Sequence, residues 1–546
     1  MIFILISYFY VLFITYNLGF LLKKTLNLKT NNPAYIIIAG LFLQLLILSF
    51  FALFSAVDSL FYTLNSLLSI TIFLCYFKEI KQTLGLTKKT FYSFSTFSKT
   101  TFISLAILAI AICSTSPILY DNESYYIQTI KWINNYGFIK GLANLHPFFA
   151  QNSGLHLLQS SFNFSFFTNR LNDINGFLMI IFSFLCLQKL ESFFKMKNWL
   201  DLFLSLILCC TGFFFPFISS PSPDFPLFLI VPLIIYLFLK NEEKDSKVIL
   251  ITIFSLFITL IKVTIFPILI LPIYLLFSSK TSIRNVSFFL LLSAVSLLSF
   301  CLKNYVISGY PLYPLSLGSE MFSPDWKLPN FIHNTIFAPN ENAIDLSFSN
   351  YRNINYYLNL ASISVVILFP FIFTHKKKYN FLFFYILIQF LALFFTSFHY
   401  RFFAPVSLSI ILLIASRFLS KKEMFIKPMI CISILGTIFI IFLGGDLKFI
   451  SKNSTMTKVY TFKAHQLFYP ESNTQFKDTK YRSITIDNFK CFVPIVKYES
   501  FWQTFDGPIP CTSEYNIEYN KKFHKIVPSL RGKTIKEGFF SKKIEK

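Results

Sequence analysis

The chain has 546 residues, of which 54% are hydrophobic, 19% aromatic and only 14% charged. A mean hydropathy of +0.59 excludes an ordinary soluble globular protein and indicates a polytopic membrane protein. The formal charge of +23 would suggest a nucleic-acid partner in a soluble protein. Here much of the lysine lies in short loops between apolar runs, as it does on the cytoplasmic side of membrane proteins, so no nucleic-acid partner is expected.

Apolar windows predict an all-α fold with about fourteen transmembrane helices. The expected spans are residues 2–22, 34–54, 59–77, 101–119, 172–190, 199–219, 225–240, 247–261, 264–279, 286–302, 358–374, 380–397, 403–418 and 427–444. With both termini outside, every lysine-rich loop becomes cytoplasmic. The stretch 154–167 fits this topology only as a half-inserted or surface helix on the outer side.

This topology places most polar, potentially functional residues on the outer face. The outer segments are the loops 120–171 and 303–357, two short turns, and a tail that begins at residue 446. The tail contains Cys491 and Cys511, twenty residues apart, in a compartment where a disulfide can persist. The pairing is unambiguous because the tail has no other cysteine, but the sequence leaves open whether the bond forms.

The segment "YDNESYYIQTIKWINNYGFIKGLANLHPFF", which begins at Tyr120, follows the fourth span directly. Asp121 and Glu123 lie at the mouth of that span, and the next fifteen residues predict a helix on the membrane surface with its aromatic face at the headgroups. Asp121 could cap this helix, with Glu123 favoured in its first turn. Alternatively, a partly desolvated carboxylate here could act as a general base or help to bind a divalent cation.

At this point the chain resembles the C-type glycosyltransferase (GT-C) superfamily. These polytopic enzymes take sugars from polyprenyl-phosphate carriers on the outer leaflet, and an acidic residue after a transmembrane helix marks their first large outer loop. Together with "NSGLHLLQSS", "SSPSPDFP", "LKNYVISGYPLYP", "RFFAP" and "GPIPCT", the segment is similar to a little-characterised bacterial group of such proteins. The resemblance implies a location in the bacterial plasma (inner) membrane.

The resemblance also implies a division of the chain. Residues 100–445 would form the GT-C-like core, whereas the polarity of the outer tail itself predicts a small extracytoplasmic domain over residues 446–546. The acidic loop follows the fourth span here and the first span in the superfamily. Residues 1–99 would therefore be an N-terminal addition of three helices.

Further candidates lie at predicted outer helix ends. Asp224 closes the proline-rich turn "SSPSPD", either as an ordinary turn residue or as a second acidic group at the site. Lys303 and Arg401, with His399, either contact lipid headgroups or bind the donor phosphate. His146 is either a loop histidine without a catalytic role or a hydrogen-bond donor to sugar or phosphate, and its surroundings do not predict a metal site.

Lys262 interrupts an apolar stretch, as either a functional charge or a boundary between two short spans.

The leading hypothesis is an inverting glycosyltransferase that moves a sugar from a polyprenyl-phosphate donor to a cell-envelope glycan or lipid. Asp121 would be the base, Glu123 and Asp224 would orient the acceptor or bind a cation, and Arg401 and Lys303 would stabilise the departing phosphate. The alternatives are a polysaccharide polymerase or ligase, a lipid or polysaccharide transporter, and a non-catalytic assembly subunit. The requirement for a divalent cation stays open.

Overall fold

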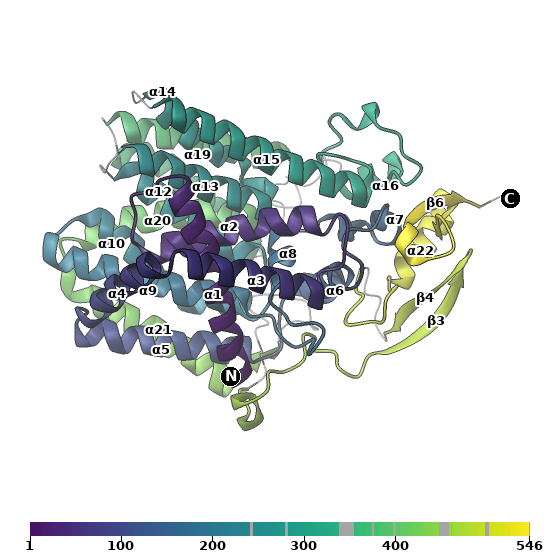
Figure 1. Ribbon diagram of the computed structural model, residues 1–546, viewed down its shortest axis with the longest axis horizontal. Coiled ribbons are helices and arrows are strands. Elements are labelled where there is room, and N and C mark those ends of the chain that lie inside the picture. Colours follow the sequence, from purple (N-terminus) through teal and green to yellow (C-terminus); the bar gives the residue numbers. More distant parts are fainter. Residues whose placement is uncertain are drawn as a thin grey trace.

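A computed structural model describes residues 1–240, 244–278, 282–337, 354–373, 376–396, 400–446, 458–459, 461–496 and 502–544. Its helices lie mainly along one axis, and the C-terminal strands cover one end of the bundle (Figure 1). The all-α membrane architecture predicted from composition is therefore confirmed in outline, with a small mixed α/β domain added to it.

Nine helices in this described part of the chain are long and apolar enough to cross a membrane. They are α1 (Ile2–Thr25), α2 (Pro33–Phe51), α5 (Thr96–Cys113), α9 (Ile174–Met196), α15 (Ile283–Ser308), α19 (Lys377–Thr396), α20 (Tyr400–Leu419), α21 (Ile426–Leu443), and the segment Trp199–Ile218, which contains α10 (Trp199–Ser205), η3 (Leu206–Cys210) and α11 (Thr211–Ile218).

The other predicted spans are also helical but shorter or bent. They correspond to α3 (Ser59–Cys75), α12 (Asp224–Leu239), α13 (Lys244–Ile261), η4 (Val263–Leu269) followed by α14 (Ile270–Ser278), and α18 (Ile354–Ile372). Helix α3 turns by 87° into the amphipathic α4 (Phe77–Tyr92), so this pair counts as at most one span. The fourteen apolar segments are thus present, but only nine or ten meet the length expected of a complete span.

The first two helices are integral to the bundle. Gly19 of α1 and Gly40 of α2 lie where the backbones touch, and a Cβ on Gly40 would overlap the carbonyl oxygen of Thr15. Small residues at such crossings let membrane helices approach closely. Ser7 of α1 also donates a hydrogen bond to the Asp173 carboxylate, just before α9. The N-terminal helices therefore pack into the same core as the following ones.

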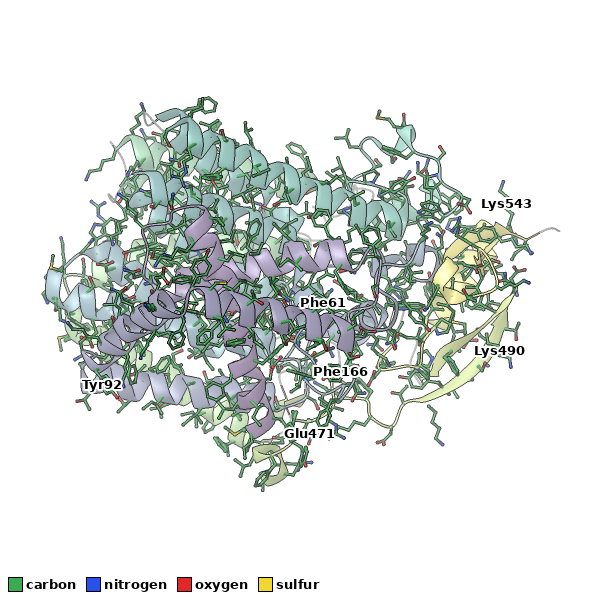
Figure 2. The ribbon with its side chains drawn as sticks, in the orientation of Figure 1. Phe61, Tyr92, Phe166, Glu471, Lys490 and Lys543 are labelled. Atoms are coloured by element: carbon green, nitrogen blue, oxygen red, sulfur yellow. The ribbon has the colours of Figure 1, made fainter. Side chains whose placement is uncertain are left out.

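The basic loops gather at one end of the bundle. Lys24 pairs with Glu79 at 3.1 Å, and Lys197 pairs with Glu423 at 2.5 Å. Figure 1 shows α4 and α10 at the end opposite the C-terminal domain, and Figure 2 places Tyr92 at that same end. The segments predicted to be cytoplasmic thus share one end, as the charge pattern requires.

The loop after α5 forms a compact layer at the other end. It contains the π-helix η1 (Asn122–Tyr126), α6 (Ile127–Tyr136), α7 (Leu142–Leu145), η2 (Pro147–Ala150) and α8 (Gly154–Ser160). Helix α8 is buried, and Ser153 before it donates to the Ile261 carbonyl at 2.6 Å. The stretch 154–167 accordingly does not cross the bundle, in line with the half-inserted helix expected from the topology. Two further short helices, η5 (Ser319–Met321) and α16 (Asn330–Phe337), follow α15.

The described part of the C-terminal region contains three antiparallel two-stranded sheets. The pairs are β1 (Gly445–Asp446) with β2 (Lys458–Val459), β3 (Lys480–Ile486) with β4 (Phe489–Ile495), and β5 (Ile526–Leu530) with β6 (Phe539–Lys543). This region also contains α22 (Glu514–Tyr519) and the short helices η7 (Ala464–Leu467), η8 (Asn520–His524) and η9 (Ile535–Glu537), whereas η6 (Glu423–Phe425) directly precedes α21. In the β3–β4 hairpin, Ile486 pairs with Phe489 and Ile484 with Cys491.

This domain packs on the loop layer and faces water on its other side. The Phe539 amide donates to the Lys140 carbonyl at 2.9 Å, while Lys490 and Lys543 project outward (Figure 2). Trp132 of α6 is buried against Phe539, with ring centroids 5.9 Å apart. The expectation that this aromatic face lies at the lipid headgroups is therefore wrong, because the C-terminal domain covers it.

Candidate functional site

Four charged side chains from distant parts of the chain meet beneath the loop layer. Asp121 precedes η1, Asp224 is the first residue of α12, Lys262 lies between α13 and η4, and Arg401 is in the first turn of α20. Each therefore lies at a break or terminus of a helix. We call these four residues the charge cluster.

Arg401 joins the two carboxylates of the charge cluster. Its Nη1 lies 2.6 Å from Asp121 Oδ2, and its Nε lies 2.5 Å from Asp224 Oδ2. Lys262 donates to the other Asp224 oxygen and lies 4.4 Å from the ring centroid of Phe402. Two acids and two bases thus balance one another in a partly desolvated place, where charge-assisted hydrogen bonds are strong.

The two carboxylates differ in their freedom to react. The Asp224 side chain is 1% exposed and has both oxygens bound by basic groups, so it is not free to ligate a metal in this arrangement. The Asp121 side chain is 25% exposed. Its Oδ2 contacts Arg401 and accepts a hydrogen bond from the Tyr126 hydroxyl at 3.3 Å, whereas its Oδ1 has no partner among the described residues.

This asymmetry suits a proton acceptor. A general base needs one oxygen fixed by its surroundings and another within reach of a substrate proton. Tyr126 is itself placed by a hydrogen bond from Arg401 Nη2 at 3.3 Å. Asp121 is therefore the member of the charge cluster that is best placed to exchange a proton with a bound hydroxyl.

Local sequence explains how the two carboxylates are presented. Pro221, Pro223 and Pro226 limit the backbone around Asp224, and a carboxylate in the first turn of a helix is favoured by the helix dipole. Arg401 has the opposite sign at the start of α20, so the two carboxylates offset an unfavourable placement. Buried charges held in this way are weak evidence of stability and are more common at functional sites.

Lys303 is a third basic group, and its environment differs from those of Arg401 and Lys262. Lys303, in the last two turns of α15, is 5% exposed and donates to the Asn152 carbonyl. No carboxylate pairs with it in the part of the chain that the structure describes. It is buried in protein, so the interpretation of Lys303 as a side chain that reaches to lipid headgroups is wrong.

His156 of α8 lies beside Tyr126, the hydrogen-bond partner of Asp121 and Arg401. Its ring centroid lies 4.7 Å from that of Tyr126, and neither of its ring nitrogens makes a hydrogen bond of normal geometry. Burial, with a smaller contribution from the positive charge of Lys303, lowers the pKa of His156 to about 3, although the Pro221 carbonyl opposes this shift. The ring is therefore neutral at physiological pH.

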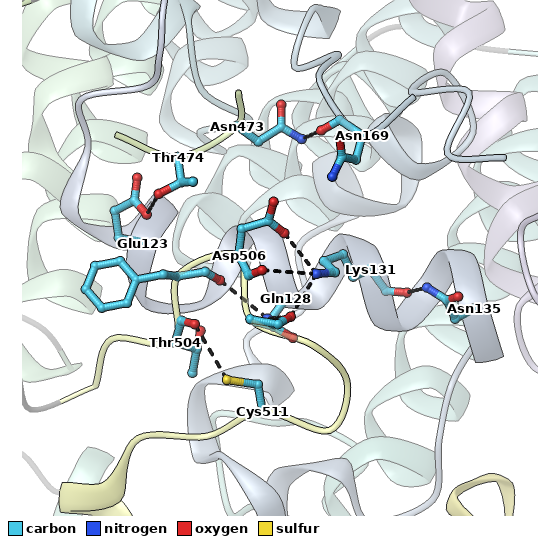
Figure 3. Close-up of polar contacts among 12 residues, drawn as sticks. Glu123, Gln128, Lys131, Asn135, Asn169, Asn473, Thr474, Thr504, Asp506 and Cys511 are labelled. Carbon is cyan, nitrogen blue, oxygen red and sulfur yellow. Dashed lines mark hydrogen bonds and ion pairs between the residues drawn. The ribbon is translucent and has the colours of Figure 1, made fainter. Parts of the chain in front are cut away.

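Glu123 does not join Asp121, although only one residue separates them in the sequence. Its carboxylate accepts a hydrogen bond from Thr474 Oγ1 at 2.6 Å (Figure 3) and another from the Gln475 backbone amide at 3.1 Å. Burial raises the pKa of Glu123 to about 7, against these hydrogen bonds. Its contacts make Glu123 an anchor for the C-terminal domain and leave no direct part for it in the charge cluster.

His146 is likewise part of the domain contact. Its ring is buried, stacks on Phe149 at 4.7 Å and lies 3.2 Å from the Trp502 carbonyl oxygen through Nε2. Burial lowers the pKa of His146 to about 4. These contacts separate it from Asp121 and favour a structural role. His399 lies outside the described residues.

Cys491 and Cys511 are both buried free thiols, so the candidate disulfide is not formed in the structure. The two are close in the fold, because Cys511 forms a β-bridge with Phe492. Within the described ranges, no group of three or more His, Cys, Asp and Glu residues is arranged to hold a metal ion.

Sequence reasoning singled out Asp121, Asp224 and Arg401, and these three meet. It named Lys262 only as a charge that interrupts an apolar run, and it did not name Tyr126 as a functional residue. The feature of the sequence that could have predicted a place for Lys262 in the charge cluster is its position at a helix break near the predicted outer helix ends.

Comparison with known proteins places the chain in a family. A family model described as a domain of unknown function (DUF8201) matches residues 1–408, so the chain belongs to that family. The match includes all four residues of the charge cluster and ends before the C-terminal domain. No curated protein and no solved structure matches the chain significantly.

Proposed function

We propose that this member of the DUF8201 family is a membrane glycosyltransferase that uses a polyprenyl-phosphate sugar donor and a cell-envelope glycan or lipid acceptor. The observation that carries the proposal is the geometry of Asp121, with Oδ2 held by Arg401 and Tyr126 and Oδ1 unpaired. A carboxylate fixed in this way, beside basic groups at one end of a membrane bundle, suits chemistry between an alcohol and a phosphorylated lipid.

In the proposed reaction, Asp121 accepts a proton while the sugar moves from the phosphate to the acceptor. The acceptor hydroxyl oxygen attacks the anomeric carbon of the donor, and its proton passes to Asp121 Oδ1. The bond between the anomeric carbon and the phosphate oxygen breaks, and its electron pair leaves with the phosphate. The attack comes from the face opposite the leaving group, so the configuration at the anomeric carbon is inverted.

The basic groups would bind the charge that develops on the phosphate. Arg401 offers planar guanidinium N–H groups, which suit phosphate oxygens. Lys262 and Lys303 add two ammonium groups, and Lys303 has no carboxylate partner in the described chain. Arg401 and Lys262 are already paired with Asp224, so an incoming phosphate would share these two cations with that carboxylate and would meet an unshared charge at Lys303.

The contacts of Glu123 and His146 give them a supporting role in this proposal. They hold the C-terminal domain over the loop that presents Asp121. Such a cover would restrict water around the reacting sugar, which otherwise competes with the acceptor.

A comparison of envelope glycans tests the function directly. Mass spectrometry of glycans and lipids from wild-type and deletion cells should show the loss of one sugar unit in the deletion, with accumulation of the corresponding polyprenyl-phosphate sugar. An unchanged glycan profile, with no accumulated donor, would contradict the proposal. Loss of a whole repeat-unit polymer with intact single repeats would favour the polymerase alternative.

A further inference from the structure

A pocket with both polar and apolar lining lies between α6, the loop 163–172 and the C-terminal domain. Its volume is about 140 Å³, and Lys131, Asn135, Asn169, Asn172, Asn473 and Asp506 are among the residues that line it. Figure 3 shows Asn473 next to Asn169 on one side and the Lys131–Asp506 pair on another. None of the residues assigned to the charge cluster lines this pocket.

The pocket offers hydrogen bonds but little net charge. Lys131 pairs with Asp506 at 2.9 Å and also donates to the Gly507 carbonyl at 2.8 Å, so its positive charge is satisfied within the protein. The remaining polar groups are mainly asparagine amides, which can both donate and accept. A charged ligand would meet no uncompensated opposite charge here, whereas a neutral polar ligand would be matched.

Two of these amides have buried atoms without a partner. Asn172 is 5% exposed, and its Nδ2 makes no hydrogen bond. The Oδ1 of Asn473 is also buried and unpaired. An unsatisfied buried donor or acceptor is costly, so two unpaired amide atoms on side chains that line one pocket favour a polar ligand that can both accept and donate hydrogen bonds.

An apolar wall completes the pocket. Ile127 and Ile130 of α6 contribute to the lining and lie on one helix face because they are three residues apart. A pyranose ring has this same combination, with hydroxyl groups at its edge and C–H groups on its faces. The pocket is smaller than a typical drug-sized site, which fits one sugar ring better than an extended chain.

We propose that this pocket binds one neutral sugar residue, and that this residue belongs to the acceptor glycan. The second part rests on the proposed function. Asp121 lies six residues before Ile127, so it is within roughly 10 Å of the pocket along the helical segment. A sugar held in the pocket would therefore place the adjoining part of a glycan close to the catalytic carboxylate.

The C-terminal domain then takes part in recognition as well as covering the site. Asn473 and Asp506 lie beyond residue 408, where the family match ends. Relatives with a different tail would keep the charge cluster and lose these two lining residues. The choice of acceptor would thus depend on a part of the chain that is separate from the catalytic core.

Saturation-transfer NMR on the full chain in lipid nanodiscs tests this inference. The probes are the methyl glycosides of glucose, galactose, mannose and N-acetylglucosamine, with methyl glucuronide as an anionic comparison. At least one neutral glycoside should receive saturation and the glucuronide should not. Lack of transfer to every neutral glycoside, or a preference for the glucuronide, would overturn the proposal.

Substitutions of residues that line the pocket test whether the sugar binds there. Asn172→Leu should weaken the affinity at least tenfold, because it removes the free donor and fills the space with a side chain of similar size. Asn135→Leu, on the exposed face of α6, is a second lining variant that remains informative if Asn172→Leu does not fold. Asn31→Leu at the opposite end, where Asn31 accepts from Lys23 at 2.7 Å, is the matched control. Unchanged binding in a folded lining variant would refute the location.

The same measurement separates this inference from the proposed function. Asp121→Asn should bind the neutral glycoside as the wild type does, because Asp121 does not line the pocket. Sugar binding without any effect of the deletion on envelope glycans would leave the pocket assigned and the transferase refuted. Sugar transfer that is indifferent to Asn172→Leu and Asn135→Leu would refute the pocket alone.

Discussion

Arg401 Nε lies 2.5 Å from Asp224 Oδ2, although the two residues are 177 positions apart in the sequence. This contact joins the start of α20 to the start of α12 and brings the charge cluster together. Its partners are largely shielded from water, so the energetic consequences of changing one of them should be large.

Asp224→Asn should destabilise the protein by about 3 kcal/mol, because it leaves Arg401 and Lys262 partly buried with only Asp121 to compensate them. Thermal unfolding in a fixed detergent measures the effect. The double variant Asp224→Asn with Lys262→Met should recover part of the loss, since it removes one unpaired charge. Equal unfolding temperatures for the wild type and Asp224→Asn would contradict the structural importance of the pair.

Lys303→Met should lower sugar transfer at least tenfold and leave the unfolding temperature unchanged or higher. Replacement of a buried charge by an apolar side chain of similar length is often neutral or stabilising. Transfer rate and thermal unfolding, measured on the same preparation, separate the two effects. A large loss of stability with transfer proportional to the folded fraction would show that Lys303 is a structural residue.

Attachment of the C-terminal domain should weaken as the pH rises. The pKa of Glu123 is raised from 4.5 to about 7, so the folded state keeps a proton that the unfolded state has already lost between these values. The stability contributed by the proton-bound form is therefore complete below about pH 4.5 and is lost as the pH rises from there to about 7. Hydrogen exchange of residues 470–477 at pH 5 and pH 8 measures this change.

Glu123→Gln provides the control for that pH dependence. The amide is neutral at both pH values, so exchange in residues 470–477 should no longer depend on the ionisation of this side chain. If the variant and the wild type, after correction for intrinsic exchange, show the same pH dependence, a group other than Glu123 controls the attachment.

Gly40→Ala should reduce the amount of folded protein in the membrane, because the added Cβ would overlap the Thr15 carbonyl where α1 crosses α2. Gly85→Ala in α4 is the matched control, since a Cβ there meets nothing within 4 Å. The control should be neutral or stabilised by up to about 1 kcal/mol, because alanine favours a helix more than glycine does. Similar membrane abundance of the two variants would contradict the close crossing.

Local patterns in the sequence predicted the helices well, because long apolar runs require helical backbone in a membrane. The same charge pattern correctly grouped Asp121, Asp224 and Arg401 at one end. It could not show that α3 turns by 87° into α4, since hydropathy marks a segment as apolar without fixing how it is tilted or broken.

The roles of individual residues depended on contacts that the sequence does not encode locally. Glu123 meets Thr474 across 351 positions, and Trp132 meets Phe539 across a still longer separation. The helix that carries Glu123 and Trp132 was predicted to lie on the membrane surface, because the sequence pattern does not show where the C-terminal tail packs. The pairing of Lys262 with Asp224 was missed for a similar reason, since it requires the relative rotation of two helices.

The most direct test of the central claim is the envelope glycan profile of deletion cells that carry Asp121→Asn at the same membrane abundance as the wild type. Asp58→Asn is the control, because Asp58 caps α3 at the same end of the bundle and asparagine is an equally good cap. The envelope glycans of deletion cells that carry Asp121→Asn should lack the same sugar as those of the deletion cells alone. Asp58→Asn should restore that sugar. Full restoration by Asp121→Asn would contradict the assignment of Asp121 as the catalytic base.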